Sequence, residues 1–548
     1  MAVQLDLSDI QGNVLAAYGK QGFPKGRALL ISIPNDKGAA ARLFIETLRR
    51  HVTSALPWEA KHRQPIPGQV MAPRPEVTLN FAFTFTGLLA LGVPIRTLRG
   101  MPDEFIDGMA ARADILCDRF PKPDGSLATI AEAYDPVWLP KACEGQRVHI
   151  LVTLNAQMDE RTGQAVPDLE EKTAYVMAMA EQAGLIVLSG HRGATPKWQE
   201  LSARLGQRAD GTYSALPLEH FGFVDGISDP VFDGQMAEAD LQKRSIGQGK
   251  LLPDQSWAPL ATGEFLLGWP DESQEIPGGA MPLDFSRNGT FMAYRKLHQN
   301  VFAWRKYMAE QSEALAQIWN MPLDETEETL AAKFAGRWRN GIPLVAAPSW
   351  AEAQAMAAKL SQASRSGDKA TEDSLRRSLV DFTYRADPVG AACPFGSHIR
   401  RANTRDMLDP LLATNDPKRL NGSVLNNRRR ILRRGLPYGN APEGGSDQDE
   451  HGIVMMALCA NLFRQFEFVQ QQWMQYGLDF NAGNDTCPII GLHFPGNKFV
   501  IPADLASGRP PFFAAGMPQF VEPRGGEYFF VPSITALRLI AQGLVDPT

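Results

Sequence analysis

The stretch Val77-Thr-Leu-Asn-Phe-Ala-Phe-Thr-Phe85 places an apolar residue at every second position. This period predicts a strand with one buried face. Working outward from it, apolar runs at 28–33, 148–154 and 185–188 predict three more strands, and residues 39–51 and 168–183 have the apolar spacing of helices. Because strands and helices interleave without a repeated parallel βαβ phosphate loop, we expect an α+β sandwich in the first third of the chain.

Beyond a break near 204–219 the pattern continues with mixed elements. An Ala-rich tract at 300–380 predicts a helical insertion, and Phe463, Phe466, Val469 and Trp473 share one face of a predicted helix. The remaining predicted strands lie at 263–269, 290–297, 398–403, 430–434 and 453–459.

The composition excludes several classes of protein. The chain has 548 residues, of which 44% are hydrophobic and 21% charged, so it can bury a large core. That length corresponds to about three to four domain equivalents, or to two large domains. The net charge of −6 lacks the overall basic character that nucleic-acid binding requires.

The cysteines and the amino-terminal residues indicate the cellular compartment of the protein. The five cysteines are scattered and form no C-x-x-C pair, which argues against zinc or iron–sulfur sites and favours a reducing compartment. Asp6 and Asp9 stand where a signal peptide needs positive charge, and no apolar run approaches the ~20 residues of a membrane helix. We therefore expect a cytoplasmic protein without a membrane partner.

Three segments could carry chemistry, and the first is Cys393-Pro-Phe-Gly-Ser-His-Ile-Arg-Arg-Ala-Asn-Thr-Arg405. No two of the nine histidines lie at i,i+2 or i,i+4, so no local metal cluster is encoded. A single histidine is usually a tolerated surface or core residue. His398 differs because a Pro/Gly loop delivers it beside three arginines, a setting that suits a site which also binds carboxylates.

The second segment, Phe221-Gly-Phe-Val-Asp-Gly-Ile-Ser-Asp-Pro230, places Asp225 at a turn beside apolar residues. A turn-forming Asp-Gly is the simpler interpretation. A carboxyl group in an apolar pocket would instead have a raised pKa and could act as an acid or a base.

The third segment is the basic run Arg428-Arg-Arg-Ile-Leu-Arg-Arg-Gly-Leu-Pro-Tyr438. Such a run is usually a solvated face or a polyanion-binding patch. On a strand, however, Ile431 and Arg433 share one face and Leu432 and Arg434 share the other, so at least one guanidinium should be partly buried and need an anionic partner.

Other motifs are weaker. The chain has no G-x-x-x-x-G-K-[ST] phosphate loop and no G-x-S-x-G nucleophile elbow. Cys393-Pro and Cys487-Pro could indicate thiolate ligation of a haem, but Cys-Pro is common by chance and His398 is the stronger candidate.

Together the three segments resemble the dye-decolourising peroxidase family. The family's Gly-x-x-Asp-Gly motif is present at 222–226, and the segments at 393–405 and 429–439 resemble its proximal-histidine and distal-arginine segments. Further similar segments lie at 9–20, 85–94, 464–474 and 524–538. The length and the 300–380 tract are similar to the long-chain branch of the family.

This resemblance implies a fold of two ferredoxin-like domains with antiparallel sheets, of the dimeric α+β barrel type. We expect an N-terminal domain over residues 1–215 and a C-terminal haem-binding domain over 216–548, with the helical insertion at about 300–380.

The resemblance also implies haem b as cofactor and assigns four residues. His398 matches the axial ligand of the haem iron, Asp225 the distal carboxylate, Arg433 the distal arginine and Arg405 a haem-propionate contact. The family often has an acidic residue hydrogen-bonded to the proximal imidazole. The position that we align with it is Asn461, and an amide there would make the imidazole less imidazolate-like.

The leading hypothesis is therefore a haem peroxidase that reduces hydrogen peroxide and oxidises one-electron donors such as dyes and phenols. Oxidation of bulky donors suggests surface Trp or Tyr residues, and ten Trp are available. One alternative is a haem-handling protein that stores or transfers haem or releases iron, without peroxide turnover. A second is a polyanion-binding module that uses residues 428–434. The oligomeric state and the physiological donor stay open at this point.

Overall fold

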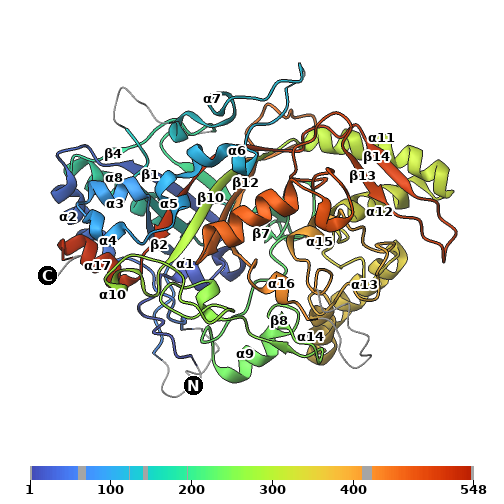
Figure 1. The fold of residues 1–548 in the computed structure, drawn as a ribbon, viewed down its shortest axis with the longest axis horizontal. Helices are drawn as coiled ribbons and strands as arrows, with labels where there is room; N and C mark the ends of the chain where they lie inside the picture. Colours follow the sequence, from blue (N-terminus) through green and yellow to red (C-terminus); the bar gives the residue numbers. More distant parts are fainter. Residues whose placement is uncertain are drawn as a thin grey trace.

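The computed structural model describes residues 3–59, 70–122, 124–139, 146–193, 195–409 and 422–544. A nine-stranded sheet formed by these residues runs through the centre of the molecule (Figure 1). Its strands follow the order β11-β12-β10-β15-β2-β3-β1-β4, with β5 (Gln199–Ser202) paired to β1. This path is open from β11 to β4, and neighbouring strands are antiparallel.

The N-terminal half has βαββαβ order. Its strands lie side by side in the order 2-3-1-4, which is the ferredoxin-like arrangement. The elements are β1 (Lys25–Ser32), α2 (Gly38–Arg49), β2 (Val77–Phe83), β3 (Ile150–Ala156), α8 (Asp168–Gln182) and β4 (Ile186–Val187).

The C-terminal half repeats this order, so the expected pair of ferredoxin-like units with antiparallel sheets is confirmed. The two half-sheets meet where Phe530 of β15 pairs with Phe83 of β2. The domain boundary near residue 215 stays a prediction. The strands of this half are β10 (Thr290–Gln299), β11 (Leu432–Tyr438), β12 (Gly452–Cys459) and β15 (Val521–Val531).

Both faces of the sheet are buried, and alternate residues of each strand point to opposite faces. On β10, for example, Phe291 and Ala293 join one core, whereas Met292 and Tyr294 join the other. The first core is covered by α2, α8, α17 (Ile534–Gln542) and the π-helical turn η6 (Leu462–Glu467). The next π-helical turn, η7 (Val469–Met474), packs into a separate core in the C-terminal half.

The expected helical insertion is present. Figure 1 shows its helices at the end of the molecule opposite the blue N-terminal helices. None of the helices formed by the described residues combines the length and apolar character needed to cross a bilayer. The insertion consists of α11 (Val301–Trp319), α12 (Leu323–Ala335), α13 (Trp350–Ser366) and α14 (Lys369–Ser378).

Three local predictions were wrong. Residues 398–402 form the short helix α15 (His398–Ala402) rather than a strand, because their arginine side chains bind backbone carbonyls of neighbouring segments. Residues 262–264 form a 3₁₀ turn (η4, Thr262–Glu264) instead of the strand expected at 263–269, since the Gly263 amide bonds to Pro270 O and closes a loop. Phe463 is 59% exposed and does not share the buried face of Phe466 and Trp473.

Strand β2 also differs in its burial. Every residue from Val77 to Phe83 is buried, so both faces are covered and not only one. The polar residues on the second face are satisfied internally: the Asn80 amide donates to Gln11 Oε1 at 3.2 Å and to Thr53 O at 3.0 Å.

Candidate active site

A cavity of about 730 Å³ lies between the sheet and the loops of the C-terminal half. Its size falls within the range of roughly 300–1,000 Å³ that is typical of small-molecule sites. The cavity brings together all four site residues predicted from the sequence, although they lie as far apart in the chain as residues 225 and 433. Its apolar walls include Ile227, Leu297, Ile431, Ile453, Met455 and Phe466.

Asp225 lies on the loop between β7 (Tyr213–Leu216) and α9 (Glu238–Ser245), and this loop is tied down at several points. The buried Glu219 carboxylate accepts the backbone amides of Phe221 and Phe223, each at 2.8 Å, and the Gln299 side-chain amide. The Asp225 amide donates to Pro217 O at 2.8 Å. Gly226 has a φ of 71°, a conformation that favours glycine, so the turn can follow Asp225 directly.

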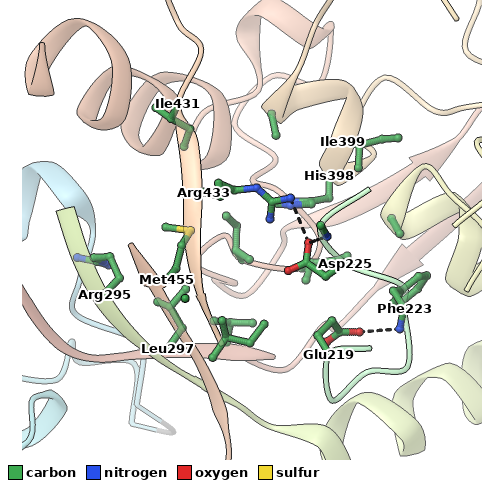
Figure 2. Close-up of a pocket in the computed structure, with 18 of the residues that line it drawn as sticks. Glu219, Phe223, Asp225, Arg295, Leu297, His398, Ile399, Ile431, Arg433 and Met455 are labelled. Carbon is green, nitrogen blue, oxygen red and sulfur yellow. Dashed lines mark hydrogen bonds and ion pairs between the residues drawn. The ribbon is translucent and has the colours of Figure 1, made fainter. Parts of the chain in front are cut away.

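Asp225 forms an ion pair with Arg433, with Nη2 3.1 Å from Oδ1 (Figure 2). The same Oδ1 accepts the Gly226 amide at 2.6 Å. The second oxygen, Oδ2, has no hydrogen-bond partner among the described residues. Each of the two side chains is 45% exposed, and this exposed surface faces the cavity that both residues line. One carboxylate oxygen is thus held in place and the other can exchange a proton with a molecule in the cavity.

The pKa of Asp225 is below its usual value, which is opposite to the expectation from the sequence. Burial alone would raise the pKa of this carboxyl group, but the Arg433 guanidinium and the Gly226 amide together outweigh burial. Conversely, the neighbouring Asp225 carboxylate raises the pKa of Arg433. Both groups are therefore charged over the whole neutral range.

The basic run at 428–434 is divided between the two faces of β11, as its period predicted. Arg433 points into the cavity, whereas Arg434 is buried and pairs with Asp229 at 3.0 Å and with Asn13 O and Val14 O. Arg428 pairs with Asp271 at 3.0 Å. Much of this run is therefore paired with carboxylates of the same chain, so it does not form the free basic patch that the polyanion-binding alternative needs.

His398 is the first residue of α15 and lines the same cavity. Its Nδ1 lies 3.3 Å from the sulfur of Cys487, and Nε2 has no hydrogen-bond partner among the described residues. Burial alone would raise the pKa of the Cys487 thiol, but the adjacent His398 and Arg401 lower it.

The sequence alignment of Asn461 with the partner of the proximal imidazole is wrong. Asn461 begins η6, where its side-chain oxygen accepts the Arg464 amide at 2.8 Å. This capping contact, and not a contact with His398, is the role of its amide. Cys393, the other candidate from the Cys-Pro pairs, is buried, and burial raises the pKa of its thiol to about 11.

Three arginines of the cavity lack a carboxylate partner among the described residues: Arg405 and Arg430, which are buried, and Arg337, which is half-buried. Arg337 and Arg430 donate only to backbone carbonyls in these contacts, and Nε of Arg405 has no partner. Burial, reinforced by Arg405, lowers the pKa of Arg337 to about 10 and that of Arg430 to about 9. Burial likewise lowers the pKa of Arg405.

These uncompensated guanidiniums indicate a missing anion, because a buried cation is costly without a partner. Arg405 is also held at a φ of 50°, a backbone conformation that costs a non-glycine residue of order 1–3 kcal/mol and is concentrated at functional sites. The cavity thus combines an imidazole nitrogen, apolar walls and cations without counter-ions. This set fits a haem: His398 for the iron, the walls for the ring and the arginines for its propionates.

Sequence reasoning missed Arg337, Glu219 and Cys487. Arg337 lies just after α12, and nothing in the surrounding pattern marks it. Glu219 lies six residues before Asp225, where a buried carboxylate could have been suspected from its apolar neighbours. Cys487 was noted only as a Cys-Pro pair, since its contact with His398 spans 89 residues.

Comparison with known proteins gives consistent results. Peroxidase 2 of Mycetinis scorodonius is 28% identical over 560 residues, which span 98% of this chain and 88% of the relative. Dye-decolorizing peroxidase AauDyP1 of Auricularia auricula-judae is 26% identical over 554 residues, 98% of this chain and 87% of the relative. No protein-family model matches the chain.

Among solved structures, a dye-decolorizing peroxidase in complex with 2,6-dimethoxyphenol superposes with a TM-score of 0.66 at 23% identity. The match covers 98% of this chain and all of that one, which shows a shared fold. The sequence matches to curated peroxidases extend over nearly the same length. In sequence and in fold, the chain is thus similar from end to end to dye-decolourising peroxidases.

Proposed function

We propose that the protein is a peroxidase that reduces hydrogen peroxide and oxidises one-electron donors such as dyes and phenols. The observation that carries the proposal is the Asp225–Arg433 ion pair, which presents an open carboxylate oxygen to the cavity that His398 also lines. Similarity to dye-decolourising peroxidases over nearly the whole chain supports the same activity, and the similar structure with bound 2,6-dimethoxyphenol supports phenols as donors.

Haem b is the proposed cofactor: His398 Nε2 would bind its iron, and Arg405, Arg337 and Arg430 would pair with its propionates. When bound, haem supplies a redox-active iron that accepts two oxidising equivalents from peroxide and passes them on singly. The arginines would gain the anionic partners that they lack, so cofactor binding and stability of the pocket are linked.

Asp225 has the geometry of the proton carrier. Oδ1 is occupied by the Gly226 amide and Arg433, so Oδ2 would take a proton from hydrogen peroxide in the cavity and return it to the oxygen that leaves when the O–O bond breaks. Because its pKa is below the usual value, the carboxylate is ionised and ready to accept a proton in weakly acidic solution.

Arg433 has two roles that follow from its position. Its guanidinium holds the Asp225 carboxylate in place, and it lies where it can stabilise negative charge on peroxide oxygen as the O–O bond breaks. The loop around Glu219 keeps Asp225 aimed into the cavity. A cytoplasmic location and the absence of nucleic-acid and membrane partners remain predictions from the sequence.

The test is the absorption spectrum of the haem-reconstituted protein before and after one equivalent of peroxide, followed by turnover of 2,6-dimethoxyphenol and of a dye. The pyridine haemochrome spectrum identifies the haem type. We expect one haem per chain, a rapid spectral change with peroxide and a return to the starting spectrum on addition of donor. Bound haem without peroxide turnover would establish the haem-handling alternative, and failure to bind haem would refute both.

A further inference from the structure

Cys487 occupies the position next to the imidazole that is proposed to bind iron. Its sulfur is fully buried and lies 3.3 Å from His398 Nδ1, within the range of a hydrogen bond to sulfur. No other partner of Nδ1 is present among the described residues. If Nε2 gives its lone pair to iron, a neutral imidazole carries its proton on Nδ1, and the Nδ1–H group then donates to the Cys487 sulfur.

The two residues are held by a common framework. Arg401, three residues after His398 on α15, is buried and donates to four backbone carbonyls. One of them is Asp485 O at 2.9 Å, two residues before Cys487, and another is Trp473 O at 3.1 Å in η7. This guanidinium therefore connects the helix that carries the imidazole to the segment that carries the sulfur.

The backbone of Cys487 is fixed as well. Its amide donates to Met474 O at 2.7 Å, and its carbonyl accepts the Gly491 amide at 3.0 Å. The ring of His493 lies against the same carbonyl, with Nε2 at 3.2 Å. The sulfur thus has little freedom to leave the imidazole.

We propose that Cys487 is the positioning residue of the proximal histidine and that its sulfur, instead of a carboxylate, accepts the Nδ1–H hydrogen bond. The inference rests on the proposed haem-dependent function. A histidine that binds a metal usually donates its second N–H to a carboxylate, a backbone carbonyl or water, and this partner tunes the basicity of the ligand. Sulfur is a weak acceptor, so His398 keeps the character of a neutral imidazole and donates less electron density to the iron.

The test uses three variants of the haem-loaded full chain. Cys487→Asp introduces a strong hydrogen-bond acceptor, and Cys487→Ala removes the acceptor. Cys487→Ser replaces the sulfur with a hydroxyl oxygen, which is a small acceptor. Two properties are measured: the iron–histidine stretching frequency of the ferrous protein and the ferric/ferrous midpoint potential. If Cys487 had only a structural role, neither property would follow the strength of the hydrogen-bond acceptor at position 487. Each tenfold change in the preference of the site for ferric over ferrous haem corresponds to about 59 mV.

We expect Cys487→Asp to raise the stretching frequency and lower the midpoint potential, and Cys487→Ala to do the opposite. Loss of such a partner typically weakens metal binding or activity by about 10–100-fold, so the alanine variant should also retain haem less tightly. Cys393→Ala is the matched control, because Cys393 is equally buried and five residues from His398 in sequence, whereas the hydrogen bond of the His398 ring within the described part of the chain is to Cys487. It should leave both properties unchanged.

If the frequency and the potential are the same in wild type and in the Cys487 variants that fold, the positioning role is refuted. Cys487→Ser, which is almost isosteric, decides the matter if the aspartate variant does not fold. An equal shift in Cys393→Ala would also refute it, since the effect would then be general to the pocket. Wild-type protein that binds no haem, or does not turn over peroxide, would instead refute the proposed function.

Discussion

The losses of rate caused by replacing Asp225 and Arg433 should not multiply when both residues are replaced in one variant. The perturbations are Asp225→Asn, which keeps shape but removes the proton acceptor, Arg433→Leu, which removes the guanidinium, and the double variant. The two side chains are in direct contact, 3.1 Å apart, and both line the cavity that is proposed to take peroxide. In the proposed mechanism they therefore act on the same bond in the same transition state.

The magnitudes follow from this contact. Loss of a positioned acid–base group typically costs about 10²–10⁴-fold, and loss of a preorganised charge donor about 10²–10³-fold. If each single variant loses about 10²-fold, or ~2.7 kcal/mol, independent action would give about 10⁴-fold in the double variant. We expect the double variant to be little slower than the worse single one. The implied coupling of ~2.7 kcal/mol lies within the roughly 0.5–3 kcal/mol found for contacting residues.

Stopped-flow absorbance after mixing with peroxide measures this rate. The experiment belongs at neutral pH, because loss of Arg433 raises the pKa of Asp225 and a reading in acid would mix protonation with the loss of charge stabilisation. Haem content of each variant serves as the control for an intact pocket. If the rate losses of the two single variants multiply in the double variant, action on one transition state is refuted. A wild-type rate in Arg433→Leu would show that Arg433 is not the distal arginine.

Four further outcomes are expected. His398→Ala should lose stable haem binding, measured by haem titration, and a normal ferric spectrum in this variant would refute the axial assignment. Dye turnover should be highest at acidic pH and should fall only below the lowered pKa of Asp225. In Arg433→Leu this fall in activity should begin at a higher pH. An optimum above neutrality for both dyes and small phenols would count against Asp225 as proton carrier. Arg405→Leu should weaken haem binding yet leave the apo-protein at least as stable to heat, because it removes a buried cation without a carboxylate partner; a large drop in the melting temperature of the apo-protein would contradict this. Arg434→Leu should destabilise the fold, by breaking its pair with Asp229, while the folded fraction reacts with peroxide at the wild-type rate.

The sequence alone determined most of the sheet and four of the groups in the cavity, Arg405 among them. Strand periodicity is a local property, because successive side chains point to opposite faces whatever lies beyond them. The segments predicted at 77–85, 290–297 and 453–459 accordingly became β2, β10 and β12. Asp225, His398 and Arg433 stand in distinctive local motifs, so they too could be found before their meeting in one cavity was known.

Tertiary structure decided what depends on long-range contact. The second face of β2 is buried only because loops cover it, so its alternation could not reveal that burial. The sign of the Asp225 pKa shift was missed, since it depends on Arg433, which is 208 positions away in sequence, rather than on the apolar neighbours in sequence. The partner of His398 is Cys487 and not Asn461, because hydrogen bonds depend on distances in space, and the Arg401 framework that brings the sulfur to the imidazole exists only in the folded chain.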